Sequence, residues 1–259
     1  MLRISVHKFS SCDGCQLSLL NMGGTLVALG DAIELVHFLE AGYNNFDTPV
    51  DISFVEGSIN SIEDRERLAR IRENSKYLVA IGACATSGGL QALIRFHNDE
   101  ERNVGIYPDV QAVAQYRNPV SLSECVHIDH EIHGCPISES SMLDCILQYV
   151  HHSVPTRNDG KVCNECKMKN HTCLMVTRKE ACLGNVTQAG CGALCIGMGR
   201  TCYGCYGPAE NSQPMNLSNY LRKTGFPAEE IQNRFLHIHN QRKPFQEAGE
   251  NSGPEKQPA

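Results

Sequence analysis

Residues 77–89 read Tyr-Leu-Val-Ala-Ile-Gly-Ala-Cys-Ala-Thr-Ser-Gly-Gly, an apolar run followed by a glycine-rich loop. A short apolar run that stops at glycine is typical of a buried strand in a parallel sheet. Loops after such strands often bind phosphate, but no Gly-x-Gly-x-x-Gly follows a predicted strand, and no Gly-Lys-Ser/Thr occurs. The loop instead presents the thiol of Cys84, so a bound nucleotide is not expected in this chain.

Strand-like and helix-like patterns alternate on both sides of this motif. Strands are expected at 3–8, 33–39, 51–55, 77–82 and 126–132, and helices at 16–28, 62–73, 87–96 and 140–150. This alternation predicts an α/β domain whose parallel sheet is covered by helices on both faces. Functional residues of such sheets lie on loops after the carboxyl ends of the strands. We therefore expect convergence at one sheet edge of Cys12, Glu56, Cys84 and Cys135, each of which follows a predicted strand.

The composition excludes several classes of function. The 259 residues include 23 Lys and Arg against 29 Asp and Glu, so the net charge of −6 offers no basic footprint for nucleic acid. No apolar run approaches the ~20 residues that span a bilayer, and Cys12 comes too early for a signal peptide. We expect a cytoplasmic protein with no nucleic-acid partner and no direct membrane insertion. Disulfides are rare in the cytosol, so the 14 cysteines indicate metal or redox chemistry.

The cysteines divide the chain into two regions. Six are spread over the first 150 residues, and eight crowd into the next region, namely Cys163, Cys166, Cys173, Cys182, Cys191, Cys195, Cys202 and Cys205. The segment 151–160 contains Pro, Asn, Asp and Gly and is the expected linker. The predicted parts are a first domain at 1–152, a cysteine-rich domain at 161–210, a helical extension at 211–245 and a disordered tail at 246–259. Short helices are expected at 216–224 and 228–235.

Eight clustered thiols predict two four-ligand sites, because one zinc ion and one cubane cluster each take four ligands. The outer pairs Cys163/Cys166 and Cys202/Cys205 would suit a zinc site, but the inner spacings suit it poorly. Small residues and glycine surround the inner cysteines, and glycine permits the close backbone approach that a bulky inorganic cluster needs. The spacing therefore favours iron–sulfur over zinc. It leaves two partitions open, a sequential one and one that exchanges Cys182 and Cys205.

The first region contains one close pair, Cys12 and Cys15. Alone, this C-x-x-C would suggest a thioredoxin-type redox pair. Cys84 and Cys135 on neighbouring strand-end loops instead favour a third four-ligand site. Cys125 and Cys145 remain, and they are expected to be buried small apolar residues of a strand and a helix.

Four motifs of the first region together resemble the small subunit of NiFe hydrogenases. They are Cys12-Asp13-Gly14-Cys15, Glu56-Gly57-Ser58, the loop at 82–89 and His133-Gly134-Cys135-Pro136. The resemblance implies a flavodoxin-like domain that holds a proximal 4Fe-4S cluster through Cys12, Cys15, Cys84 and Cys135. The 20 kDa subunit of complex I shares this domain, but it normally has adjacent cysteines at the first motif and lacks a second cysteine-rich region. Gln16 departs from the family, where many members have an acid.

The cysteine-rich region resembles the delta subunit of cytosolic bidirectional hydrogenases, also called sulfhydrogenases. The motifs are residues 182–195 and Cys202-Tyr203-Gly204-Cys205-Tyr206-Gly207-Pro208. This resemblance implies a ferredoxin-like domain with two further 4Fe-4S clusters. It also implies a NiFe large subunit and iron–sulfur and flavin/NAD(P)-binding subunits as partners, which would carry the NiFe centre, FAD and NAD(P). Electrons would pass through this chain, which alone would not turn over hydrogen. Small subunits of F420-linked and heterodisulfide-reductase-linked hydrogenases are similar and remain the alternative, as does a complex-I-type 20 kDa-like subunit of a respiratory assembly. A zinc-stabilised adaptor without a redox role is a further hypothesis of a different class.

Overall fold

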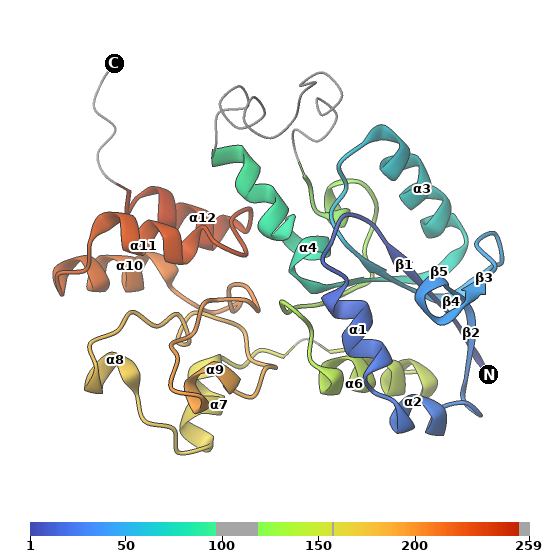
Figure 1. Cartoon of the computed structure of the whole chain (residues 1–259), viewed down its shortest axis with the longest axis horizontal. Helices are drawn as coiled ribbons and strands as arrows, with labels where there is room; N and C mark the ends of the chain where they lie inside the picture. The colour runs from blue at the N-terminus through green and yellow to red at the C-terminus, as the bar shows by residue number, and fades with distance from the viewer. Residues whose placement is uncertain (97–118, 157, 254–259) are drawn as a thin grey trace. The chain divides into compact units, whose positions relative to one another are not determined.

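A computed structural model describes residues 1–96, 119–156 and 158–253, which form two compact units (Figure 1). The units are Met1–Pro155 and Thr156–Ala259, so their boundary falls inside the segment 151–160. All fourteen cysteines lie in described segments and are free thiols. Within the described ranges, none of the helices is both long enough and apolar enough to cross a membrane.

The first unit is built on a six-stranded sheet with the order β3-β2-β1-β4-β5-β6. Neighbouring strands pair in parallel, except that β2 and β3 are antiparallel. The strands are β1 (Leu2–Lys8), β2 (Ile33–Phe38), β3 (Tyr43–Asn44), β4 (Val50–Glu56), β5 (Ser75–Ile81) and β6 (His130–Ile132). Without the edge strand β3, this is the flavodoxin-like order, which confirms the predicted fold class. The order reverses between β1 and β4, the point where such sheets bind ligands.

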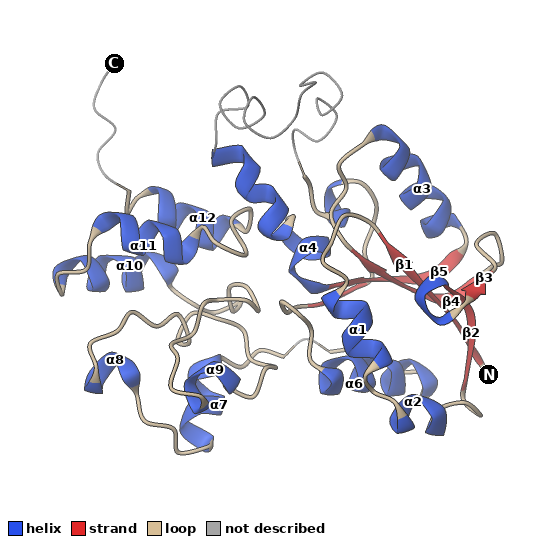
Figure 2. Cartoon of the chain, viewed as in Figure 1, coloured by secondary structure: helices blue, strands red, loops and turns tan. Residues whose placement is uncertain are grey.

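Helices cover both faces of this sheet (Figure 2). One face packs Ile4, Phe54 and Ile81 against Leu19 of α1 and Met142 of α6. On the other face, Leu68 and Ile71 of α3 pack on Val55, Leu78 and Ala80. The helices of the unit are α1 (Gly14–Leu20), α2 (Gly24–Ala28), η1 (Leu39–Ala41), α3 (Ile62–Glu73), α4 (Gly82–Ser87), η2 (Gly89–Phe96), η4 (Leu122–Glu124) and α6 (Glu139–Val150).

Two expected helices differ from the structure at glycines. The helix predicted at 16–28 is divided into α1 and α2, because Gly23 at the break has a φ of +47°. The helix predicted at 87–96 is also divided. Here α4 begins at Gly82, directly after β5, and ends at Ser87, because the next residue, Gly88, has a φ of +73°. A 3₁₀ helix follows. Positive φ favours glycine and interrupts an α-helix.

The strand predicted at 126–132 is also shorter than expected. Only β6 (His130–Ile132) pairs with β5. Cys125 therefore does not lie in a strand. It caps the 3₁₀ helix η4 and is half-buried, whereas Cys145 is buried in α6, as expected.

The second unit has one core that joins its cysteine-rich segment to its C-terminal helices. Leu183 and Cys202 pack in one cluster with Phe235 and Phe245. The helices are α7 (Val162–Met168), α8 (Leu174–Thr177), α9 (Leu194–Gly197), α10 (Pro214–Lys223), α11 (Ala228–Phe235) and α12 (Lys243–Glu250). Helix α12 corrects the disorder expected from 246, because Phe245 and Ala248 are buried against the core. Residues 254–259 of that tail lie outside the described part of the chain.

Candidate iron–sulfur sites

Four cysteines converge at the carboxyl edge of the sheet in the first unit. Cys12 lies in the loop after β1, Cys15 in α1, Cys84 in α4 directly after β5, and Cys135 in the loop after β6. Their thiols are near enough to influence one another. Cys84 and Cys135 both raise the pKa of Cys15, and Cys12 raises the pKa of Cys84 and of Cys135. The structure thus brings together the four thiols that the sequence analysis selected.

The environment of these thiols is unlike that of a thioredoxin-type redox pair. Burial raises the pKa of Cys84 to about 12 and also raises that of Cys135. The pKa of Cys15 is raised still more, by burial first and by the nearby Glu56 carboxylate second. A reactive redox thiol has a lowered pKa and a stable thiolate. A thiol with a raised pKa loses its proton when a bound metal supplies positive charge. These cysteines are therefore better suited to be metal ligands than nucleophiles.

Glycines allow three of the four thiols to pack directly against the backbone. A Cβ on Gly82 would overlap the Sγ of Cys15, and one on Gly89 would lie 2.7 Å from the Sγ of Cys84. A Cβ on Gly14 would lie 3.4 Å from the Sγ of Cys12. Four soft sulfur donors lined by bare backbone fit an iron–sulfur cluster.

Glu56 fixes the start of the helix that carries Cys15. It ends β4, and its side chain is almost fully buried. Its two carboxylate oxygens accept the backbone N–H groups of Cys15 and Gln16 at 3.2 and 3.1 Å. Burial raises the pKa of Glu56, and these two hydrogen bonds oppose the rise. A carboxylate at a helix N-terminus is electrostatically favourable, so Glu56 positions the first ligand motif.

We expect Glu56→Ala to lower the thermal unfolding temperature of the first unit. It would leave two backbone N–H groups at the start of α1 without an acceptor, and each lost partner costs about 1–3 kcal/mol. Glu56→Gln keeps one acceptor oxygen and should destabilise less. The measurement is anaerobic circular dichroism during heating, with the exposed Glu73→Ala as the control. If the Glu56→Ala and Glu73→Ala proteins had the same unfolding temperature, Glu56 would not hold the Cys12/Cys15 motif in place.

In the second unit, one group of thiols surrounds Cys166 of α7. Burial raises the pKa of Cys166, and the thiols of Cys163, Cys182 and Cys173 raise it further. Cys163 lies on the same helix, and its backbone N–H donates to the carbonyl of Gly184 at 2.8 Å. Cys173 and Cys182, which follow α7 in the chain, therefore lie near the two cysteines of this helix.

The other group lies around Cys202. Burial raises the pKa of Cys202 to about 12, with further contributions from Cys182 and Cys205. The backbone N–H of Cys202 also donates to the Sγ of Cys182 at 3.4 Å. Cys191, whose pKa is raised by burial, interacts with Cys195. Cys182 thus interacts with both groups.

Sequence reasoning missed three polar side chains that contact candidate ligands. The contacts join Cys84 Sγ to Gln91 Oε1 at 3.3 Å, Cys191 Sγ to Glu165 Oε2 at 3.9 Å and Cys202 Sγ to Thr187 Oγ1 at 3.6 Å. Each polar residue lies at least seven positions from its thiol, so no local motif marks it.

Across the described segments, no three His, Cys, Asp or Glu side chains lie close enough together to hold a single metal ion.

Comparison with known proteins places this chain in a family. Residues 12–149 match the family described as NADH ubiquinone oxidoreductase, 20 Kd subunit. The sulfhydrogenase 2 subunit delta of Pyrococcus furiosus is 30% identical over 89% of this chain and 96% of its own. A vhu subunit of the F420-non-reducing hydrogenase of Methanocaldococcus jannaschii is 28% identical over 89% of this chain and 91% of its own.

A solved structure supports the fold. The crystal structure of an NAD+-reducing [NiFe]-hydrogenase in the H2-reduced state contains a chain that matches with a TM-score of 0.53 at 24% identity. The match covers 60% of this chain and 94% of that chain. The curated relatives, by contrast, extend over both units. The chain therefore belongs to the NADH ubiquinone oxidoreductase 20 Kd subunit family and is a hydrogenase subunit of the iron–sulfur electron-transfer type.

Proposed function

We propose that this chain is the electron-transfer small subunit of a multi-subunit NiFe hydrogenase. It carries electrons between a large subunit that holds the NiFe site and a partner that binds flavin and NAD(P). In this function the chain supplies ligands, spacing and surroundings for three 4Fe-4S clusters, and the reaction with hydrogen takes place on the large subunit. Its place of action is the cytoplasm.

Twelve of the fourteen cysteines would hold the clusters. Cys12, Cys15, Cys84 and Cys135 would hold the proximal cluster in the first unit. The second unit would hold two more through Cys163, Cys166, Cys173, Cys182, Cys191, Cys195, Cys202 and Cys205. Bound clusters of this type supply one-electron carriers, whose potentials depend on hydrogen bonds and burial. The N–H groups of Cys202 and Gly204, which donate to the sulfur atoms of Cys182 and Cys202, are suited to that tuning.

The observation that carries this proposal is the convergence of four thiols, from the segments that follow β1, β5 and β6, at the carboxyl edge of the sheet, with glycine beside three of them. Glu56 holds the first motif at the same edge. A zinc-stabilised adaptor would not explain why glycines lie beside three of the four thiols at this edge. A complex-I-type subunit gives no role to the eight thiols of the second unit, because the family match ends at residue 149.

A second candidate differs only in the electron acceptor. The similarity to a subunit of an F420-non-reducing hydrogenase extends over both units, as does the similarity to sulfhydrogenase delta. A small subunit that serves a heterodisulfide-reductase-type partner therefore shares every ligand. The co-purifying subunits distinguish these functions, because a flavin subunit with a dinucleotide fingerprint would favour NAD(P).

The test is anaerobic purification of the native complex through a tag on this chain. We expect a NiFe large subunit among the partners, and about twelve iron and twelve sulfide per copy of this chain, since each cubane has four ligands and four irons. Hydrogen should reduce methyl viologen in this preparation. A colourless protein that contains only zinc would contradict the proposal, as would a complex of respiratory membrane subunits without a NiFe partner.

A further inference from the structure

Three adjoining short helices of the second unit expose apolar side chains. Met168 ends α7, Val176 lies in α8, and Leu194 and Met198 lie in and just after α9, with exposed fractions from 68% to 84%. Side-chain contacts join the helices. The Lys169 Nζ donates to the Gly192 carbonyl at 2.7 Å, and the Arg178 Nη1 donates to the Gly199 carbonyl at 3.2 Å. We call Met168, Val176, Leu194 and Met198 the apolar patch.

Basic residues flank the members of this patch along the chain, and we call them the basic rim. Residues 161–205 contain six Lys or Arg and only two Glu, although the chain as a whole has a net charge of −6. The exposed members of the rim are Lys167, Lys169, Arg178, Lys179 and Arg200. Both glutamates are already engaged, since Glu165 accepts the N–H of Gly190 at 3.0 Å and Glu180 lies 3.9 Å from Arg178. The local excess of positive charge therefore favours an acidic partner.

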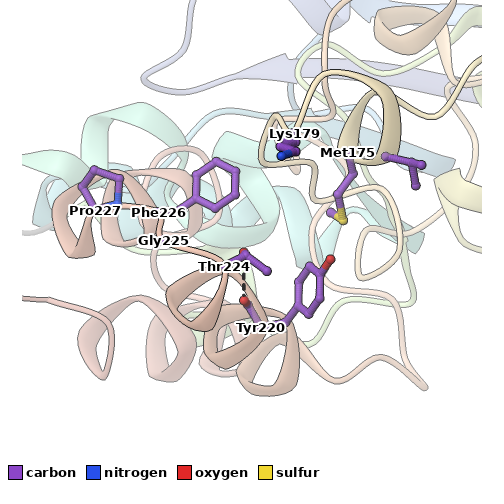
Figure 3. A pocket seen from close by; sticks show the side chains of 8 residues that line it. Met175, Lys179, Tyr220, Thr224, Gly225, Phe226 and Pro227 are labelled. Carbon is purple, nitrogen blue, oxygen red and sulfur yellow. Dashed lines mark hydrogen bonds between the residues drawn. The ribbon is translucent and has the colours of Figure 1, made fainter.

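Val176 of the apolar patch also lines a pocket. Figure 3 shows the side chains around this pocket. Its volume is about 630 Å³. Met175 and Val176 of α8 line it from one side, and Tyr220, Thr224 and Phe226 line it from the end of α10 and the following turn. Lys179 of the basic rim also lines it. An apolar surface pocket is suited to receive an apolar side chain of a partner protein, and the nearby cation favours a carboxylate on that partner.

The same helices carry candidate cluster ligands. Cys173 is exposed and forms the N-cap of α8, and Cys195 lies within α9. A protein bound over the apolar patch would therefore lie next to Cys173, the one exposed cysteine of this unit's described residues.

We propose a docking surface for an acidic electron-transfer protein. It consists of the apolar patch, its basic rim and the pocket lined by Tyr220 and Val176. The partner would insert an apolar side chain into the pocket and place carboxylates against Lys167 and Lys179. The redox nature of this partner rests on the proposed function, whereas its acidic and apolar character follows from the surface itself.

The test uses the anaerobically purified complex with hydrogen as donor and two acceptors. Methyl viologen is a small molecule that needs no docking surface, and an acidic ferredoxin is the protein probe. In Lys167→Glu/Lys179→Glu, we expect kcat/KM for ferredoxin to fall about 10- to 100-fold, the range of electrostatic effects on association. The rate with methyl viologen should not change. Val176→Ser should weaken ferredoxin reduction without altering its dependence on salt.

The control is Lys76→Glu/Lys243→Glu, which makes the same change in net charge at exposed lysines outside the rim. It should leave both rates unchanged. Unchanged ferredoxin reduction in the rim variant would overturn the proposal. An equal fall in the rate with methyl viologen would also overturn the proposal. It would show that the lysines balance the charge of the bound clusters. Loss of the large subunit from the rim variant would overturn it too, and would assign the surface to that subunit.

The affinity of the same ferredoxin for the complex separates this proposal from the proposed function. If the complex turns over no hydrogen but binds ferredoxin with a Kd that rises in the rim variant and not in the control, the docking surface holds and the hydrogenase function fails. Equal Kd values for the rim variant and the control would overturn the docking surface, whatever the activity.

Discussion

Replacing Cys135 with alanine is expected to remove about four of the twelve irons and to abolish hydrogen-dependent reduction of methyl viologen. The iron loss follows from the proposed role of Cys135 as one of four ligands of a single cluster. The two units have separate apolar cores, so the eight irons proposed for the second unit should remain. Activity should be lost completely because electrons would reach the other clusters only through the proximal one. Iron and sulfide analysis, with electron paramagnetic resonance after reduction by dithionite, measures the outcome.

Cys145→Ala is the matched control for this substitution. Cys145 lies in the same unit and is buried in α6, and burial alone raises its pKa to about 12, without a contribution from any other thiol. All twelve irons should therefore remain in Cys145→Ala, and also in Cys125→Ala. Equal iron content in Cys135→Ala and Cys145→Ala would refute the assignment of the proximal ligands. Loss of all twelve irons in Cys135→Ala would show that the clusters of the two units do not assemble independently.

The sequence predicts the first unit well because its signals are local. The helix at 62–73 has the bounds of α3, since Ser61 accepts the N–H of Asp64 as an N-cap and the apolar positions Leu68 and Ile71 repeat at helical spacing. The meeting of four strand-end loops follows from parallel pairing, which brings the carboxyl ends of neighbouring strands to one edge. Parallel pairing therefore predicts that the pair Cys12 and Cys15 lies near Cys84 and Cys135, although these three positions are far apart in the sequence.

What the sequence did not predict depends on contacts between distant segments. The composition after 246 is that of a disordered tail, yet α12 forms because Phe245 packs edge-on against Phe235, with ring centroids 5.6 Å apart. In the same way, Gln91, Glu165 and Thr187 reach their thiols through the fold. The division of the helix expected at 16–28 could have been predicted from the sequence, because two successive glycines follow Met22 and glycine often interrupts a helix.

Gly82→Ala is expected to remove the proximal cluster although it changes no ligand. Gly82 begins α4, two residues before Cys84, and has a φ of +84°. An alanine there costs about 1–2 kcal/mol for the left-handed conformation. Its methyl group would also overlap the Sγ of Cys15, which is held in place by the hydrogen bond from its N–H to Glu56. The thiol must therefore leave its position, and the proximal cluster should be absent or reduced to less than full occupancy.

Gly42→Ala separates the two costs. Gly42 has nearly the same φ, +85°, but a Cβ there meets no atom within 4 Å. Gly42→Ala should therefore lower the unfolding temperature by the backbone cost alone, about 2–8 °C per kcal/mol depending on domain size, and should keep all twelve irons. Gly82→Ala should lose about four irons and the reduction of methyl viologen. If the two variants retained the same iron content, the close approach of the Cys15 thiol to Gly82 would not be needed for a cluster, and the proximal site would lose its main structural support.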